Sequence, residues 1–163
     1  MAAVYEKLGI RFFFPEDWDL DESEALDGNN MVSVYSPLGA FWSVIVHPPG
    51  LEPEDLLDAA LEAMRQEYPE LDAEPFCDVI QGHEIVGSDL NFYCLDLTNS
   101  ALVRAFGTSR GTYLVLCQAD DREFERVGAV FEAMTHSLLD PTASSDGFDQ
   151  LQRGVTAGEP EIG

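Results

Sequence analysis

The chain has 163 residues, and its 45% apolar content, with ten phenylalanines, suits one globular domain with a sizeable core. Its 31 acidic residues far outnumber 8 basic ones, and the formal net charge of −23 argues against nucleic acid and anionic membrane surfaces as partners. No apolar run approaches the roughly 18 residues of a membrane-spanning helix, and the N-terminus has no leader pattern, so we expect a cytoplasmic protein.

The first strand is expected at Gly9–Phe14, where an apolar run stops at Pro15. The acidic segment 19–30 ends in Asp-Gly-Asn-Asn and is expected to be a loop. Two more strands are predicted at 31–35 and 41–47. The short Ser-Pro-Leu-Gly segment between them favours a hairpin.

A first helix is expected to begin near Pro53, because proline is tolerated in a first turn and acidic neighbours suit the positive helix N-terminus. Apolar residues then recur at spacings of 4, 3 and 4 residues, at Leu57, Leu61, Met64 and Tyr68. This is the period of an amphipathic helix, which Pro69 ends.

Five strand candidates follow, at 74–80, 84–86, 91–97, 102–108 and 112–119. Asn99-Ser100 and Arg110-Gly111 are short turn signals, so consecutive antiparallel hairpins are expected between residues 90 and 119. Whether 84–86 is a separate strand or the front of the strand at 91–97 is left open by the pattern.

A second helix is expected from Asp120-Asp121, because an aspartate followed three residues later by Glu123 resembles a capping box. Its apolar face repeats at spacings of 3 and 4 residues, at Phe124, Val127, Phe131, Met134 and Leu138. The composition then changes to small and polar residues. We therefore expect a single domain at 1–139 and a disordered acidic tail at 140–163, in which Phe148 and Leu151 could dock as a short motif.

This order of elements predicts an α+β fold: a bent antiparallel sheet of about six to seven strands, flanked by two main helices. The opening Gly-Ile-Arg-Phe-Phe-Phe-Pro-Glu-Asp-Trp, the helix after the third strand, the strand Gly111–Leu116 and the closing helix are similar to those of the PsbP/DcrB/Mog-type superfamily. The resemblance covers about residues 8–139. It implies an α/β/α sandwich and a scaffold that binds other proteins. Its members include photosystem II extrinsic proteins, periplasmic lipoproteins, a Ran-binding transport factor and chaperones of secreted bacterial effectors.

Residues that commonly bind metals or act as nucleophiles are few and scattered in this sequence. The three cysteines, Cys77, Cys94 and Cys117, each lie in an apolar run without a CxxC pair, which is typical of buried free thiols in a reducing compartment. The histidines, His47, His83 and His136, define no site, so we expect no metal and no cofactor.

Acidic residues are abundant, but abundance alone does not define an acid–base pair. The stretch 17–27 lacks the spacing of a calcium loop, and the chain has no Walker, GxGxxG, GxSxG or HExxH motif. We therefore expect a protein that is not an enzyme. Its acidity either attracts a basic partner or only maintains solubility, including in a salt-adapted source.

Aromatic residues are the feature that points to binding. Phe12, Phe13 and Phe14 cannot all face one side of a strand, and Trp18 follows closely. Either both faces of the sheet are covered, or part of an apolar groove is exposed for a partner. The candidate protein-binding surface is formed by Phe12, Phe14, Trp18, Phe41 and Trp42.

Three hypotheses for function follow from these observations. The leading one is a non-catalytic domain that binds an unidentified protein partner. The alternatives are a bacterial secretion-effector chaperone or adaptor, and a small-ligand binder or enzyme without a recognisable motif.

Overall fold

The structure is a computed structural model that describes residues 2–157, and Met1 and residues 158–163 lie outside the described part. The elements follow in the order β1 (Ala2–Lys7), β2 (Ile10–Pro15), β3 (Asp19–Asp21), α1 (Ser23–Leu26), β4 (Met31–Tyr35), β5 (Phe41–His47), α2 (Pro53–Glu67), β6 (Asp72–Ile80), β7 (His83–Cys94), β8 (Leu97–Gly107), β9 (Thr112–Asp120), α3 (Asp121–Leu139) and α4 (Ser145–Ala157). The two long helices and most strands lie where the sequence predicts them.

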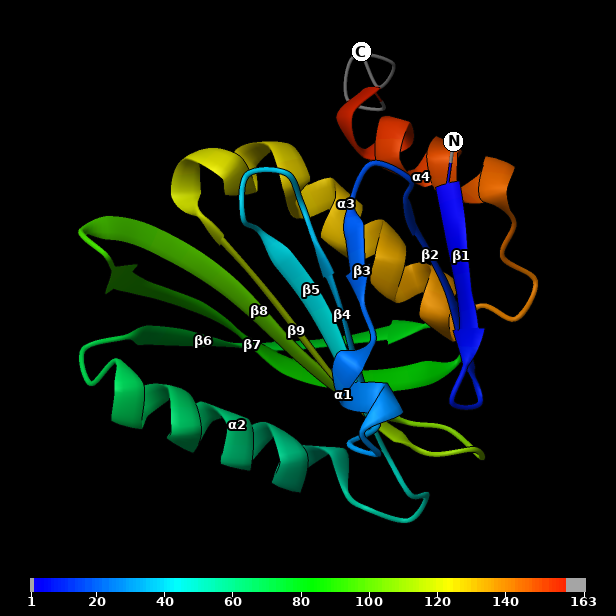
Figure 1. Ribbon diagram of the computed structural model, residues 1–163. Helices are drawn as coiled ribbons and strands as arrows, with labels where there is room; N and C mark the ends of the chain where they lie inside the picture. The colour runs from blue at the N-terminus through cyan, green and yellow to red at the C-terminus, as the bar shows by residue number, and fades with distance from the viewer. Residues whose placement is uncertain (1, 158–163) are drawn as a thin grey trace.

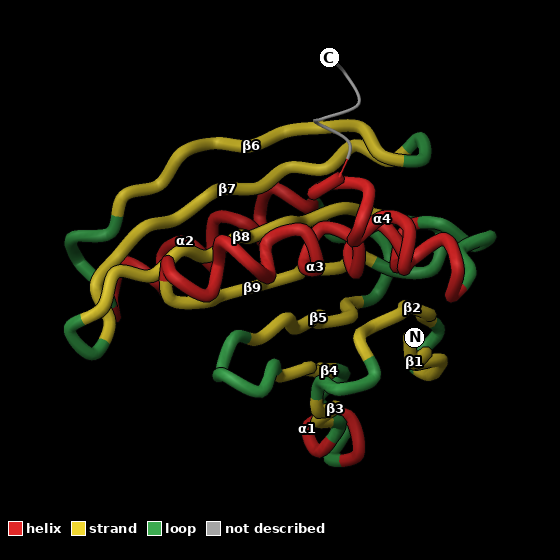
Figure 2. Tube along the Cα trace, turned by 90° about the horizontal axis from the view of Figure 1, so that it is seen from above, coloured by secondary structure: helices red, strands yellow, loops and turns green. Residues whose placement is uncertain are grey.

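Among the described residues, seven strands form one antiparallel sheet in the order β3-β4-β5-β9-β8-β7-β6, and β1 and β2 form a separate hairpin. Figure 2 shows this order, with the long outer strands β6 and β7 at one side of the sheet and the short strands β4 and β3 at the other. Strand β5 pairs directly with β9, although α2 and the three strands β6, β7 and β8 lie between them in the sequence. The predicted α+β fold with an antiparallel sheet is confirmed.

The two long helices cover opposite faces of the main sheet, as Figure 1 shows. Helix α2 packs on β7, β8 and β9, and its apolar residues Leu57, Leu61 and Met64 meet a small cluster around Leu90 and Phe92. Helix α3 packs on β2, β9 and β8 on the other side. The molecule is therefore an α/β/α sandwich.

The larger of the two hydrophobic clusters lies on the α3 side and contains most of the aromatic residues. Phe12 of β2 lies 4.7 Å from Trp42 of β5, measured between ring centroids, and Phe131 of α3 meets Trp18 edge-to-face at 6.0 Å. The indole Nε1 of Trp42 donates a hydrogen bond to Thr135 Oγ1 at 3.1 Å. The buried indole thus keeps a polar partner inside the core.

Both helix starts follow the chemistry that the sequence indicates. Pro53 occupies the first turn of α2, with acidic residues beside it. At α3, the Asp120 side chain accepts a hydrogen bond from the Glu123 backbone N–H at 2.9 Å. The Glu123 carboxylate accepts its own bond from the hydroxyl of Ser36, 2.5 Å away, and so ties the helix start to the β4–β5 connection.

Two local expectations are wrong, the loop at 19–30 and the turn at Asn99-Ser100; in addition, one strand was not predicted and one open alternative is resolved. Residues 2–7 form β1, and the expected acidic loop 19–30 contains β3 and α1. The candidates at 84–86 and 91–97 belong largely to one long strand, β7, and the turn after it is Leu95-Asp96, not Asn99-Ser100. Strand pairing decides these positions, because Cys94 and Leu97 face each other as the last pair of the hairpin.

The expected disordered tail is also wrong for its described part, because α4 spans Ser145–Ala157. Phe148 is 1% exposed and lies 6.1 Å from Phe13, between ring centroids. Arg11 Nη1 donates to the carbonyl oxygen of Ala143 at 2.9 Å and holds the α3–α4 connection. Residues 158–163 of the predicted tail lie outside the described residues. No helix in the described part of the chain has the length and apolar character needed to cross a membrane.

Candidate functional site

The predicted binding surface is mostly interior. Phe12, Phe14, Trp18 and Trp42 are buried in the large cluster, so they cannot contact a partner in this structure. The reason is that α3 packs on β2 and on the main sheet, and that Phe12 of β2 and Trp42 of β5 pack against each other. Phe41 lies on the other face of β5, half-buried beside Tyr35 with ring centroids 6.0 Å apart.

The three cysteines have three different environments. Cys117 is buried, and burial raises the pKa of its thiol, which disfavours the reactive thiolate. Cys94 is half-buried, and its sulfur accepts a hydrogen bond from the Tyr68 hydroxyl at 3.5 Å. Cys77 is exposed on the outer strand β6, so the expectation that all three are buried is wrong for this residue. Within the described residues, His, Cys, Asp and Glu form no group of three that could hold a metal ion.

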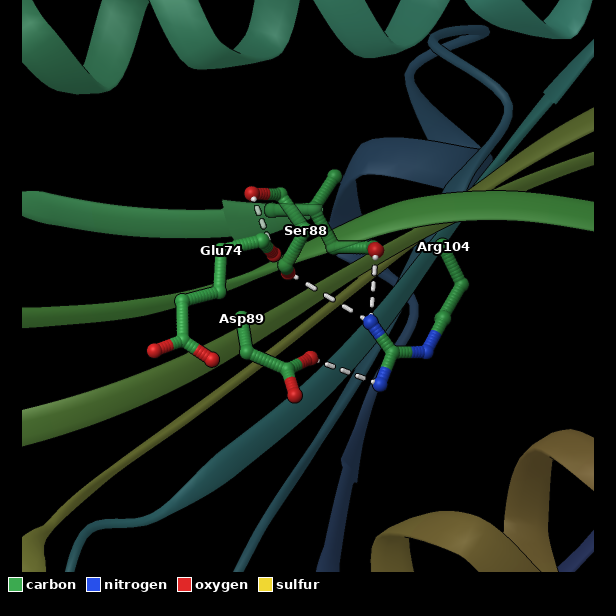
Figure 3. A network of polar contacts seen from close by, with 5 residues as sticks. Glu74, Ser88, Asp89 and Arg104 are labelled. Carbon is green, nitrogen blue, oxygen red and sulfur yellow. Dashed lines mark hydrogen bonds and ion pairs between the residues drawn. The ribbon is translucent and has the colours of Figure 1, made fainter. Parts of the chain in front are cut away.

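A buried arginine forms the most extensive polar network on the outer strands (Figure 3). Arg104 of β8 is 8% exposed, and its Nη2 lies 2.8 Å from Asp89 Oδ1 of β7. Nη1 donates to the carbonyl oxygens of Val103 at 3.0 Å and Ser88 at 3.4 Å. The guanidinium also lies over the Phe76 ring of β6, 3.5 Å from its centroid.

Gly87 is what leaves room for this arrangement. It is paired with Phe76 on one side and with Arg104 on the other, and a side chain there would collide with the Val103 carbonyl oxygen and the guanidinium. The arginine is therefore occupied on several sides by groups of its own chain. It joins β6, β7 and β8 and has a structural role.

The exposed end of the β7–β8 hairpin is the candidate functional site. Tyr93, Leu95 and Leu97, which we call the hairpin tip, are 74%, 91% and 52% exposed. In Figure 1 this hairpin extends beyond the sheet at the end where α3 begins. Apolar side chains concentrated at such a projection favour contact with another molecule.

The turn at the tip has an unusual backbone for its residues. Leu95 and Asp96 have φ of 52° and 64°, and positive φ at both central residues is the pattern of a type I′ turn, which favours Asn-Gly or Asp-Gly. Two other two-residue turns, Leu8-Gly9 and Gln81-Gly82, also have positive φ, and each places glycine second. Leu95-Asp96 has no glycine.

Leu8 and Leu95 adopt the same left-handed conformation but differ in their surroundings. Leu8 is half-buried and packs against the large hydrophobic cluster, which offsets the backbone cost. Leu95 is almost fully exposed, so nothing comparable stabilises it within the described chain. A left-handed bulky residue costs about 1–3 kcal/mol, and such strain concentrates at functional positions.

Polar contacts brace the hairpin below its tip. The Asn99 amide donates to the carbonyl oxygens of Leu97 at 3.0 Å and Cys94 at 3.5 Å, on either side of the turn. Ser100 Oγ donates to Asp121 Oδ1 at 2.7 Å and so links β8 to the start of α3. The residues that suggested a turn in the sequence therefore support the neighbouring turn instead.

A shallow cavity of about 520 Å³ adjoins the tip. It is lined by Leu97, by the exposed Leu38 from the β4–β5 connection, and by the first turns of α3. Asp120, Asp121 and Glu123 bring negative charge to this wall, and Arg122 and Arg126 bring positive charge. The sequence did not predict the hairpin tip, because Leu95-Asp96 is not one of the residue pairs that usually mark a two-residue turn. The only available signal was the alternation of the apolar residues Tyr93, Leu95 and Leu97 with Cys94 and Asp96.

Comparison with protein-family models and with curated proteins finds no match. Among solved structures, the cyanobacterial PsbP (CyanoP) from Synechocystis sp. PCC 6803 matches with a TM-score of 0.57 and 14% identity, over 83% of this chain and 90% of that one. A protein of unknown function from Pseudomonas aeruginosa, PA94, matches with a TM-score of 0.53 and 10% identity, over 88% and 99% of the two chains. At these identities the likeness concerns the fold alone. The resemblance expected from the Pro-x-x-Trp opening and the closing helix is thus confirmed at the level of architecture: this chain has the PsbP-like fold.

Proposed function

We propose that this protein is a non-catalytic protein-interaction domain that docks through the hairpin tip. The observation that carries the proposal is Leu95, a large apolar residue that is 91% exposed in a left-handed conformation. Asparagine at this position would fit the turn at a lower cost, so the leucine is explained by a role of its side chain outside the free molecule.

The charge of the molecule indicates what kind of partner fits. Asp96 lies in the turn itself, three acidic residues against two arginines line the adjoining cavity, and the chain carries a net charge of −23. A partner with an apolar pocket rimmed by Lys and Arg would bury Leu95 and gain electrostatic attraction. A second copy of this chain is disfavoured, because like charges of this size repel.

The open edge of the sheet is a poorer docking place than the tip. Strand β6 is an edge strand, but Pro75 in its middle has no N–H to donate, and the Asp78 carboxylate occupies the N–H of Val79 at 2.7 Å. Addition of a partner strand along β6 would therefore lack two backbone hydrogen bonds. The apolar tip has no such restriction.

Substitution of Leu95 by asparagine separates binding from folding. We expect Leu95→Asn to raise the free energy of unfolding by about 1 kcal/mol, because asparagine tolerates positive φ. The same variant should bind the partner at least about tenfold more weakly, since an anchoring side chain is lost. A destabilised variant, or one that binds as well as the parent protein, would contradict the proposal.

The partner can be identified with a photo-reactive amino acid placed at position 95 in the full chain, in lysate of the source cell. Position 79 on β6 is the matched control, because Val79 is also an exposed apolar residue. We expect a species captured at 95 but not at 79, competed by the parent chain but not by Leu95→Asn, and reduced by high salt. Equal capture at both positions, or a partner without a basic apolar surface, would count against the proposed docking.

A further inference from the structure

A cavity of about 580 Å³ lies at the opposite end of β7 and β8 from the hairpin tip. It forms where the β1–β2, β6–β7 and β8–β9 turns meet the end of α3, and we call it the turn-end pocket. Its size falls within the range of about 300–1,000 Å³ that is typical of small-molecule sites.

The lining of the turn-end pocket is unusual for so acidic a protein. Lys7, Arg11 and Arg110 all line it, which is three of the eight basic residues of the chain. They come from two separate turns that the fold brings together. Only two acidic side chains, Glu6 and Asp140, line the same pocket. Basic side chains are therefore enriched in this pocket compared with the whole chain, although Glu22 offsets the charge of Lys7 and Glu6 that of Arg11.

Most of these charges already have partners in the chain. Lys7 Nζ lies 3.0 Å from Glu22, and Arg11 is bonded to the Ala143 carbonyl oxygen. The Asp140 carboxylate accepts from the hydroxyl and the backbone N–H of Thr142, and these bonds lower the pKa of Asp140. The Asp140 carboxylate is thus bound to the α3–α4 connection through Thr142.

Arg110 is the exception. In the part of the chain that the structure describes, its guanidinium has no hydrogen bond and no ion pair, although its backbone is well held. Thr108 Oγ1 accepts from the backbone N–H of Arg110 at 3.1 Å and from that of Gly111 at 3.3 Å. A braced turn thus presents an unpartnered guanidinium, which can bind a carboxylate through two parallel bonds.

The floor of the turn-end pocket is apolar. Ile10, Tyr113 and Leu139 line it and are buried, and Tyr113 is held by the Phe106 ring, edge-to-face with centroids 5.5 Å apart. Leu138 and Pro141 are the more accessible apolar residues of the lining, and they can cover the hydrocarbon part of a ligand. A ligand with both an apolar body and a charged end uses both features.

We propose that the turn-end pocket binds a small organic monocarboxylate with an apolar body, and that Arg110 anchors its carboxylate. A single negative charge is favoured over a polyanion such as a nucleotide, because the rim also carries two acidic side chains and the molecule as a whole is negative. The proposal is independent of docking at the hairpin tip, which lies at the other end of the sheet.

This inference is tested by measuring how three compounds bind to the full chain: octanoate, its neutral analogue 1-octanol, and inorganic phosphate. We expect saturable binding of octanoate by calorimetry, with NMR shifts at Gly111, Tyr113 and Leu139, and binding of octanol and phosphate about tenfold weaker or absent. Arg110→Gln should weaken octanoate binding about tenfold. Arg65→Gln on α2, which removes the same charge outside the pocket, should leave it unchanged.

Several outcomes would overturn the inference. They are no saturable binding of octanoate up to about 10 mM, octanol binding as tightly as octanoate, an equal effect of the two arginine variants, or shifts confined to the α2 face. None of these results depends on Leu95, so this proposal and the proposed docking can fail separately.

Discussion

At the scale of single residues, Gly87 and Arg104 show how one small side chain makes a buried charge tolerable. A buried guanidinium is costly unless its donors are satisfied. Gly87 leaves space above β7, so that the Arg104 guanidinium and the Phe76 ring can lie against each other. Asp89 forms an ion pair with the guanidinium, and two carbonyl oxygens accept its hydrogen bonds.

We expect Gly87→Ala to lower the free energy of unfolding by about 3 kcal/mol, because the added methyl group forces β7 and β8 apart. Gly107→Ala in β8 is the matched control, since its nearest neighbour would be 4.0 Å away, at Pro53. Chemical denaturation measures both changes. Equal stabilities of the two variants would show that Gly87 is not needed for the arginine network.

At the scale of elements, α4 packs against the core instead of forming a disordered tail. In β2, Phe12 and Phe14 lie on one side of the strand, with Phe12 against Trp42 of β5, which leaves Phe13 on the opposite side. Phe148 of α4 covers Phe13 and is itself buried. This explains why three consecutive phenylalanines can all be interior.

Phe148→Ala should therefore cost about 3–4 kcal/mol of stability, because it leaves a cavity and exposes Phe13. Leu151→Ala on the same helix should cost less than about 1 kcal/mol, since Leu151 is 39% exposed. Thermal or urea unfolding distinguishes the two. If both variants unfold like the parent protein, α4 does not contribute to the core in solution.

At the scale of the whole molecule, the net charge of −23 sets a repulsion that the compact state must overcome. Raising the NaCl concentration from about 20 mM to about 0.5 M shortens the screening length several-fold. We expect the Tm to rise by several degrees over this range, because the repulsion between exposed carboxylates is screened. A Tm that stays constant or falls would show that repulsion is not limiting, and calorimetry at fixed pH gives the answer.

The sequence by itself determined the elements whose signals are local. Leu57, Leu61 and Met64 place α2, and Asp120 starts α3, because helical periodicity and capping depend on neighbours within a few residues. The order of these elements was enough for the α+β class and for the PsbP-like resemblance.

Tertiary structure alone decided where the surface lies. Burial of Phe12 and Trp42 depends on α3 and on strands distant in sequence, and the position of the turn at Leu95 depends on pairing between β7 and β8. The pocket around Arg110 likewise exists only because separate turns converge with the end of α3. Such contacts join residues far apart in the chain, so no local pattern records them.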